Sequence, residues 1–219
     1  MRIKICGLNP IRDVQICIDL KVNFLGFVFY KKSPRNVNLN EIKNLFKYNK
    51  QKSSFVAVTV DPTDDFINKT ILNNFDYIQL HGNETNERVK EIKSMGLKVI
   101  KAIKIKEESD IVNYKKFVEA DIILFDTPGM EKSIEFPKSL ISKLPKGERY
   151  ALAGSISVEN IENMVKSGVS FCDLSSSLEI DKQIGYKDHQ KIKKFIPRSM
   201  QSCTSLIGCK PHTFILILI

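Results

Sequence analysis

The sequence has 219 residues, no tryptophan and no long apolar run. A membrane-spanning helix needs about 20 consecutive apolar residues, and the apolar end of the chain, Phe214 to Ile219, is far shorter. The amino-terminal residues also lack the apolar region of a secretory signal. We therefore expect a cytoplasmic protein with no membrane partner.

Cysteines are few and follow no metal or disulfide pattern. Their number is odd, and no two of them have the C-x-x-C spacing of a zinc or redox site. This argues against a disulfide framework and against a metal site, and it predicts reduced thiols in a cytosol. The five cysteines are Cys6, Cys17, Cys172, Cys203 and Cys209.

Acidic residues are fewer than basic ones, and the formal net charge is +9. The lysines are spread along the chain, which is typical of solvated helix faces. A nucleic-acid-binding protein would show a basic stripe interleaved with aromatic residues, or a known binding module. Neither is present, so we expect no nucleic-acid partner, and the charge instead suits small anionic molecules.

Strand-like apolar runs recur about every 24 residues, a spacing that fits one strand, one helix and two short loops. Helical periodicities lie between the runs, with polar caps, early prolines and terminal glycines where helix ends need them. The predicted strands are Arg2–Cys6, Phe24–Phe29, Ser54–Val60, Tyr77–Leu80, Lys98–Ile103, Ile122–Phe125, Arg149–Ala153 and Phe171–Leu174.

Eight strands alternating with eight helices predict a small, single-domain (β/α)8 barrel of the α/β class over residues 1–197. A doubly wound open sheet is the alternative. It is disfavoured because no G-x-G-x-x-G follows the first strand and because the eight units are evenly sized. Residues 198–219 break the pattern, and we expect them to form an irregular extension outside the barrel.

Residues suited to proton transfer and anion binding follow several predicted strands. Each has a plain structural alternative: a buried apolar thiol, a surface arginine, a satisfied histidine or a turn-capping aspartate. Their joint placement favours function, because the carboxyl ends of barrel strands form one face that carries the active site. The candidates are Cys6, Arg35, His81 and Asp126.

Small residues follow the last two strands, at Gly154-Ser155 and at Ser176-Ser177. Barrels commonly bind phosphate at this position with backbone N–H groups and a short helix amino-terminus. Together with the thiol, the histidine and the carboxylate, these loops predict an acid–base enzyme that acts on an anionic phosphorylated metabolite.

Six segments of the chain together resemble the phosphoribosylanthranilate isomerase family of tryptophan biosynthesis. The motifs of the first and fourth strands are fairly specific, whereas the glycine and serine motifs alone are weak. The similarity runs in order over about residues 1–196. The segments are Lys4-Ile5-Cys6-Gly7-Leu8, Ser33-Pro34-Arg35, Ile78-Gln79-Leu80-His81-Gly82, Asp126, Leu152-Ala153-Gly154 and Asp173-Leu174-Ser175-Ser176-Ser177-Leu178-Glu179.

The resemblance implies an Amadori rearrangement of N-(5-phosphoribosyl)anthranilate that needs neither metal nor cofactor. It implies that Asp126 is the general acid, that Cys6 as thiolate is the general base, and that Arg35 binds the anthranilate carboxylate. His81 and Asp173 are expected to bind substrate, and Gly154, Ser155, Ser176 and Ser177 the phosphate. Physical chemistry adds that a thiolate near neutral pH needs nearby positive charge or polar hydrogens.

Three departures from the family pattern bear on substrate affinity. Ser155 stands where the family usually has a second glycine, and Ser177 stands where it has another. Serine at a position that requires a positive φ costs about a kcal/mol or more. The loop after the sixth strand is also shorter than usual, with only Gly129, Lys132 and Ser133.

Two rival functions remain open from the sequence. A histidine-pathway sugar isomerase generally has aspartate where Cys6 stands, so this residue discriminates between the two enzymes. The other rival is a barrel that binds phosphate without turnover. We expect either a monomer or a homodimer.

Overall fold

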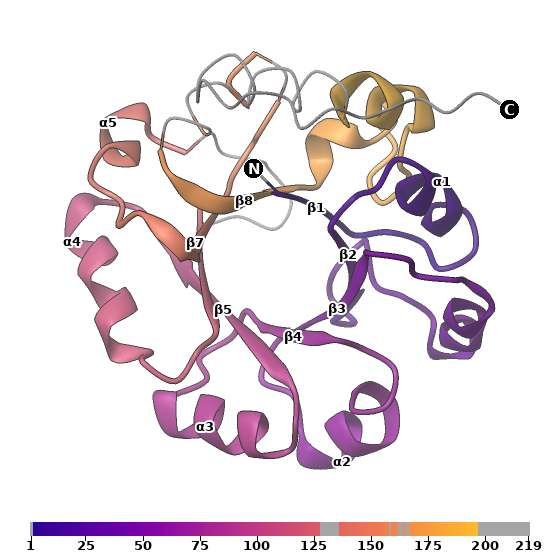
Figure 1. The fold of residues 1–219 in the computed structure, drawn as a ribbon, viewed down its shortest axis with the longest axis horizontal. Coiled ribbons are helices and arrows are strands. Elements are labelled where there is room, and N and C mark those ends of the chain that lie inside the picture. Colours follow the sequence, from indigo (N-terminus) through magenta and orange to yellow (C-terminus); the bar gives the residue numbers. More distant parts are fainter. Residues whose placement is uncertain (1, 128–135, 158, 162–163, 165–166, 197–219) are drawn as a thin grey trace, which may run out of the picture.

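The computed structural model describes residues 2–127, 136–157, 159–161, 164 and 167–196. Eight parallel strands pair in chain order, and β8 pairs with β1 to close a barrel (Figure 1). The predicted (β/α)8 barrel is therefore confirmed. The strands are β1 (Arg2–Cys6), β2 (Phe24–Phe29), β3 (Ser54–Thr59), β4 (Tyr77–Leu80), β5 (Lys98–Lys104), β6 (Ile122–Asp126), β7 (Gly147–Ala153) and β8 (Val169–Leu174).

The helical segments form the outer ring, and several are short or irregular (Figure 1). The best formed, α3, begins after Thr85, whose side chain accepts a hydrogen bond from the Arg88 N–H, and ends before Gly96, which has a φ of 98°. The segments are α1 (Val14–Asp19), η1 (Leu39–Lys47), α2 (Asp64–Phe66), η2 (Ile67–Ile71), α3 (Asn86–Ser94), α4 (Glu108–Ile111), η3 (Val112–Lys116), α5 (Lys138–Ile141), η4 (Ser176–Leu178) and a helix over residues 189–196.

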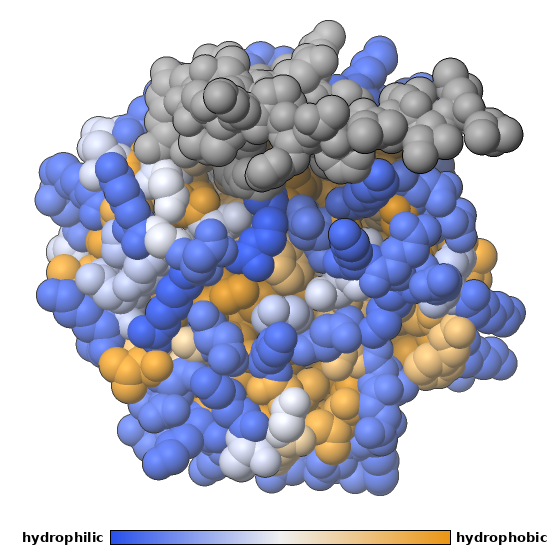
Figure 2. Space-filling view, in the orientation of Figure 1, coloured by the Kyte–Doolittle hydropathy of each residue, from blue (hydrophilic) through white to orange (hydrophobic). Residues whose placement is uncertain are grey.

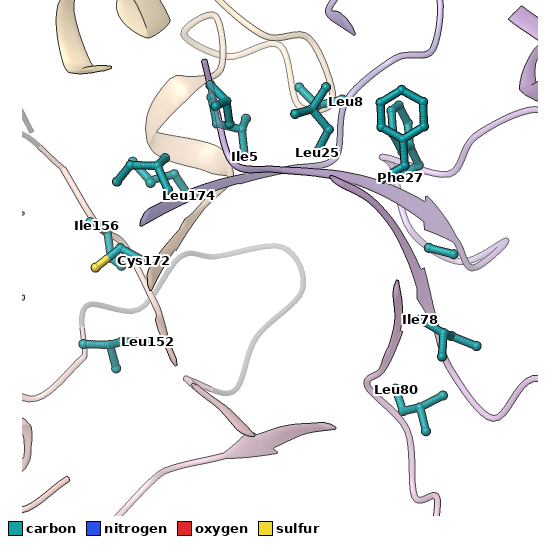
Figure 3. Packing of buried hydrophobic residues seen from close by; sticks show 14 of the residues in the cluster. Ile5, Leu8, Leu25, Phe27, Ile78, Leu80, Leu152, Ile156, Cys172 and Leu174 are labelled. Atoms are coloured by element: carbon teal, nitrogen blue, oxygen red, sulfur yellow. The ribbon is translucent and has the colours of Figure 1, made fainter. Parts of the chain in front are cut away.

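Each strand buries both of its faces, because helices cover the outside and side chains fill the inside. Ile5, Leu25 and Ile78 lie on the outer side of the strands, where they join the larger apolar cluster (Figure 3). Phe24 and Phe171 belong to a second cluster that fills the barrel interior. Alternation along a strand therefore separates the outer core from the barrel interior, with no solvent-facing side.

The inward positions of β1 are polar, in contrast to those of most other strands. Ile3 and Ile5 pack outward, so Lys4 and Cys6 point into the barrel. Lys4 is 0% exposed. A lysine in this position must be paired with an opposite charge, and its partner belongs to the site described below.

The predicted extension, residues 198–219, lies outside the described residues. Within the part of the chain that the structure describes, no helix is long and apolar enough to cross a membrane. On the face shown in Figure 2, hydrophilic residues surround a hydrophobic patch over the centre of the barrel.

Candidate active site

One cavity of about 560 Å³ opens at the carboxyl ends of the strands. This volume suits a ligand the size of a phosphorylated metabolite. The barrel brings every candidate residue named from the sequence onto the cavity wall. They are Cys6, Arg35, His81, Asp126, Gly154, Ser155, Asp173, Ser176 and Ser177.

Cys6 lies between two lysines and a carboxylate. The Lys4 ammonium hydrogen-bonds the Cys6 side chain, and Lys187 and Asp173 also act on it electrostatically. Burial raises the pKa of the Cys6 thiol above its usual value; the charges of Lys4 and Lys187 oppose this rise, and that of Asp173 adds to it. The resting thiol is therefore protonated at neutral pH, with two cations placed to stabilise the thiolate once it forms.

Lys4 and Asp173 form a buried ion pair in the barrel, with Nζ 2.6 Å from Oδ2. Burial opposes the charge on Lys4, but Asp173 and Cys6 together outweigh it, so the Lys4 pKa is raised. Gly26 on β2 leaves room for this arrangement, since an added Cβ would lie 3.2 Å from both the Cys6 Sγ and the Lys4 Cε. The other oxygen of Asp173, Oδ1, has no hydrogen-bond partner among the described residues.

Asp126 lies at the end of β6 with both carboxylate oxygens in contact with a partner. Its Oδ1 accepts a hydrogen bond of 2.8 Å from the Thr127 N–H, and its Oδ2 lies 3.2 Å from the His81 Nε2. The turn after His81 is held by Glu84, which accepts from the Gly82 N–H and pairs with buried Lys101 at 2.7 Å. This ion pair therefore fixes the loop that presents His81 to Asp126.

Arg35 follows β2 on the cavity wall, and Glu179 orients its guanidinium. Glu179 accepts from the Arg35 Nε at 2.6 Å and from its Nη2 at 2.9 Å. Lys187 also reaches Glu179, at 3.1 Å, and donates to the Ser175 carbonyl at 2.9 Å. Gly7 gives the arginine stem its path, because a Cβ there would lie 2.6 Å from the Arg35 Cδ.

Two short loops face the cavity at the ends of β7 and β8. Gly154 and Ser155 have φ values of 107° and 43°, and the Asn160 side chain donates to the Ser155 carbonyl at 2.9 Å. Ser176 and Ser177 begin the 3₁₀ helix η4, whose first N–H groups have no acceptor inside the helix. Both loops line the cavity, and loops of this kind can bind phosphate through their backbone N–H groups.

The two serine departures have different conformational consequences. Ser155 occupies the left-handed region, so the expected backbone strain falls on this residue. Ser177 is not among the described residues with positive φ, so the same expectation does not apply to it. The shortened loop with Gly129, Lys132 and Ser133 lies outside the described residues.

This chain is similar in sequence to known proteins. The family model for N-(5'phosphoribosyl)anthranilate (PRA) isomerase matches residues 3–198. A curated relative, the N-(5'-phosphoribosyl)anthranilate isomerase of Rhizobium rhizogenes, is 33% identical over 212 residues, covering 92% of this chain and 95% of the relative. The chain belongs to the PRA isomerase family.

Solved structures of PRA isomerases have the same fold. One, in complex with reduced 1-(o-carboxyphenylamino)-1-deoxyribulose 5-phosphate, has a TM-score of 0.78 and 26% identity, and the match covers 92% of this chain and 99% of that one. Monomers generated from the dimeric enzyme of Thermotoga maritima match with a TM-score of 0.77 and 25% identity, over 92% and 99% of the two chains.

The polar residues around the candidate groups were missed by the sequence reasoning. Lys4 and Lys187 look like ordinary lysines, and only the barrel places them beside Cys6. Glu179 ends the last of the six segments that resemble the family, but the sequence assigns it no role, and only the structure shows that it pairs with Arg35. Within the described ranges, no group of three or more histidine, cysteine or acidic residues is arranged to hold a metal ion.

Replacing Ser155 with glycine is expected to stabilise the protein by about 0.5–1 kcal/mol, because relief of about 1–2 kcal/mol of left-handed strain exceeds the added chain entropy. The matched change Ser177→Gly should destabilise it by a similar amount, because that residue lies in η4 without positive φ. Urea unfolding of both variants measures whether the free energy of unfolding rises for Ser155→Gly and falls for Ser177→Gly. A fall in stability for Ser155→Gly would contradict the strain.

Alkylation of Cys6 by iodoacetamide is expected to accelerate as the pH rises above about 8.5, the usual thiol value, because burial raises the Cys6 pKa. Below that range the thiol stays protonated and reacts slowly. Cys17 is the internal control, since burial raises its pKa to about 12. Peptide mass spectrometry with a pH series measures both rates separately from those of Cys203 and Cys209, which lie outside the described residues.

A Cys6 labelling rate that reaches its plateau below pH 8 would contradict this expectation. It would show that the two lysines lower the Cys6 pKa by more than burial raises it. The reduced product analogue should protect Cys6 from the reagent and leave Cys17 unchanged, since only Cys6 lines the cavity.

Proposed function

We propose that this chain is a phosphoribosylanthranilate isomerase, which converts N-(5-phospho-D-ribosyl)anthranilate to 1-(2-carboxyphenylamino)-1-deoxy-D-ribulose 5-phosphate in tryptophan biosynthesis. Support comes above all from the residues that line one cavity. They include the Cys6 thiol, the Asp126 carboxylate in contact with His81, and Arg35 oriented by Glu179. Two loops of glycine and serine residues line the same cavity. The substrate carries a carboxylate at one end and a phosphate at the other, with the reacting sugar carbons between them.

The substrate's two anionic ends are assigned to different groups on the cavity wall. Arg35, oriented by Glu179, binds the anthranilate carboxylate, because a planar guanidinium matches a carboxylate in charge and geometry. Backbone N–H groups of Gly154, Ser155, Ser176 and Ser177 bind the phosphate. These contacts hold the sugar between Cys6 and Asp126, which both line the cavity.

Asp126 begins the reaction by protonating the ribose ring oxygen, and the ring opens to a Schiff base. Cys6, as thiolate, then takes the proton from C2, which leaves an enol. The enol loses its hydroxyl proton and gains a proton at C1, which gives the ketone product. His81 contacts the acid, and Lys4 and Lys187 stabilise the thiolate.

Complementation tests the proposal directly. A tryptophan auxotroph that lacks this isomerase should grow with the wild-type gene and not with Cys6→Ser. A histidine auxotroph that lacks its sugar isomerase should not grow with either. Rescue of the histidine strain alone favours the first rival, and tight binding of the reduced product analogue without turnover favours the non-catalytic rival.

We propose a monomer or a homodimer, and one solved relative is described as dimeric. Light scattering of the purified chain at several concentrations distinguishes the two.

A further inference from the structure

Unpartnered buried polar atoms gather on the cavity wall. In the described part of the chain four buried side-chain atoms lack a hydrogen-bond partner: Gln79 Oε1, Ser170 Oγ, Asp173 Oδ1 and Ser177 Oγ. Three of their four residues line the cavity, and Ser170 does not. Buried polar groups in folded proteins are nearly always hydrogen-bonded, so a cluster of exceptions at one cavity indicates atoms that await a ligand.

Gln79 is the member of this cluster without an assigned role. It lies on β4, across the barrel from β8 (Figure 1), and is 1% exposed. Its strand neighbours in register are Val58 and Ile100, both apolar and both in the interior cluster. The Gln79 backbone carbonyl accepts from Thr59 Oγ1 at 3.2 Å, but the side-chain Oε1 of Gln79 has no hydrogen-bond partner among the described residues.

An unpartnered amide in this position lowers the stability of the fold, because it loses its water without gaining a partner. A methionine or leucine would fill the same space without that cost. Asp173 is already expected to bind substrate and Ser177 to bind the phosphate, whereas no charged end of the substrate is assigned to Gln79. The amide is neutral, so it does not select an anion.

The chemistry of the amide points to a hydroxyl partner. An amide offers a carbonyl acceptor and an NH₂ donor, and a hydroxyl both donates and accepts. The assignment of oxygen and nitrogen follows from hydrogen bonding, and either orientation presents a group that a hydroxyl satisfies. The sugar between the two anionic ends carries such hydroxyls.

We propose that Gln79 binds a hydroxyl of the substrate's sugar and thereby positions the sugar carbons between Cys6 and Asp126. This inference rests on the isomerase function proposed above. It predicts an unusual pair of effects for the substitution Gln79→Met, which keeps side-chain length and removes both hydrogen-bonding groups. Substrate affinity should fall while thermal stability rises.

Calorimetric binding of the reduced product analogue and thermal unfolding measure these effects. For Gln79→Met we expect about 10- to 100-fold weaker binding, from the loss of one hydrogen bond to a buried group, and a midpoint raised by about 2–4 °C. Ser170→Ala is the matched control, since it removes an unpartnered buried oxygen away from the cavity. It should raise or keep the midpoint and leave binding unchanged.

Deoxy analogues identify the hydroxyl. Two reduced product analogues are compared, one without the C3 hydroxyl and one without the C4 hydroxyl. The analogue that lacks the hydroxyl bound by Gln79 should bind wild type about 10-fold more weakly than the other. Gln79→Met should lose that discrimination, because the partner amide is gone. Comparing the two analogues on wild type and on Gln79→Met separates a direct contact from a general distortion of the site.

Unchanged binding by Gln79→Met, retained discrimination between the deoxy analogues, or a lower midpoint that accompanies weaker binding would each overturn the inference; the last result indicates a structural role. Failure of the wild-type chain to turn over substrate and to bind the analogue would instead overturn the proposed function, and the inference with it. Turnover by wild type with an unaffected Gln79→Met enzyme overturns the inference alone.

Discussion

Cys6→Ser is expected to lower kcat by about 10² to 10⁴, the usual contribution of a positioned acid or base. Serine nearly preserves the shape of cysteine, but its hydroxyl is a far poorer base at neutral pH than a thiolate. The two lysines beside Cys6 stabilise a thiolate, and they give no comparable help to an alkoxide. Steady-state fluorescence assays of the purified variant measure the loss.

Asp126→Asn is the companion change and should lower kcat by a similar factor. Asparagine keeps the shape and the acceptor oxygen for the Thr127 N–H, but it has no acidic proton for the sugar ring oxygen. Thermal midpoints should move little in either variant, because neither residue fills the apolar core. The binding constant of the reduced product analogue should also stay close to that of wild type.

Full turnover by Cys6→Ser would return Cys6 to the status of a partly buried apolar thiol. If Cys6→Ser or Asp126→Asn lowered the free energy of unfolding strongly and kcat in proportion, the side chain would have a structural role and not a catalytic one. The pH dependence offers a further check. Because burial raises the Cys6 pKa, kcat/KM of wild type should still rise with pH above about 8.5, whereas Cys6→Ser should lack this limb.

Lys4→Met is expected to lower the free energy of unfolding by about 3–5 kcal/mol, because it leaves a buried carboxylate without its partner. Both members of the pair are almost fully buried, with side-chain exposures of 0% for Lys4 and 6% for Asp173. The same change removes a cation from the thiol, so the Cys6 pKa should rise further and alkylation at fixed pH should slow. Urea unfolding and the iodoacetamide series measure these two effects.

The double variant Lys4→Met with Asp173→Asn is the matched control. It removes both charges, so it should recover much of the stability lost by Lys4→Met. It should recover the alkylation rate only in part, because Asp173 no longer raises the Cys6 pKa but the thiolate still lacks the Lys4 cation. The activity should not recover. Full recovery of alkylation and turnover would show that Lys4 serves only to neutralise Asp173.

Much of the barrel could be predicted from the sequence, because local patterns carried the information. The bounds of β1, β2 and β4 agree with the predicted runs, and those of the other strands differ by one or two residues. Helices were harder to predict. Residues Leu39–Lys47 form a 3₁₀ helix rather than an α-helix, and α4 passes into the 3₁₀ segment η3, since packing against the barrel overrides weak local preference.

The chain order of the strands, and with it the shared face of Cys6, Arg35, His81 and Asp126, was determined by the sequence itself. A parallel barrel places every strand end on one face, so strand positions alone were enough. What only the tertiary structure decided is the set of partners across the barrel. Lys4 and Asp173 are 169 positions apart, and Arg35 and Glu179 are 144 apart.

No local pattern reports such pairs, because alternation on one strand does not tell whether its polar side faces water or another strand. The closure of β8 onto β1 buries Lys4, and burial obliges it to pair with Asp173. The tertiary structure also decides the backbone conformation of the two serines. The loop after β7 places Ser155 in the left-handed region, whereas the loop after β8 does not place Ser177 there. Local sequence therefore determined where the strands end, and the closed barrel determined which charges meet there.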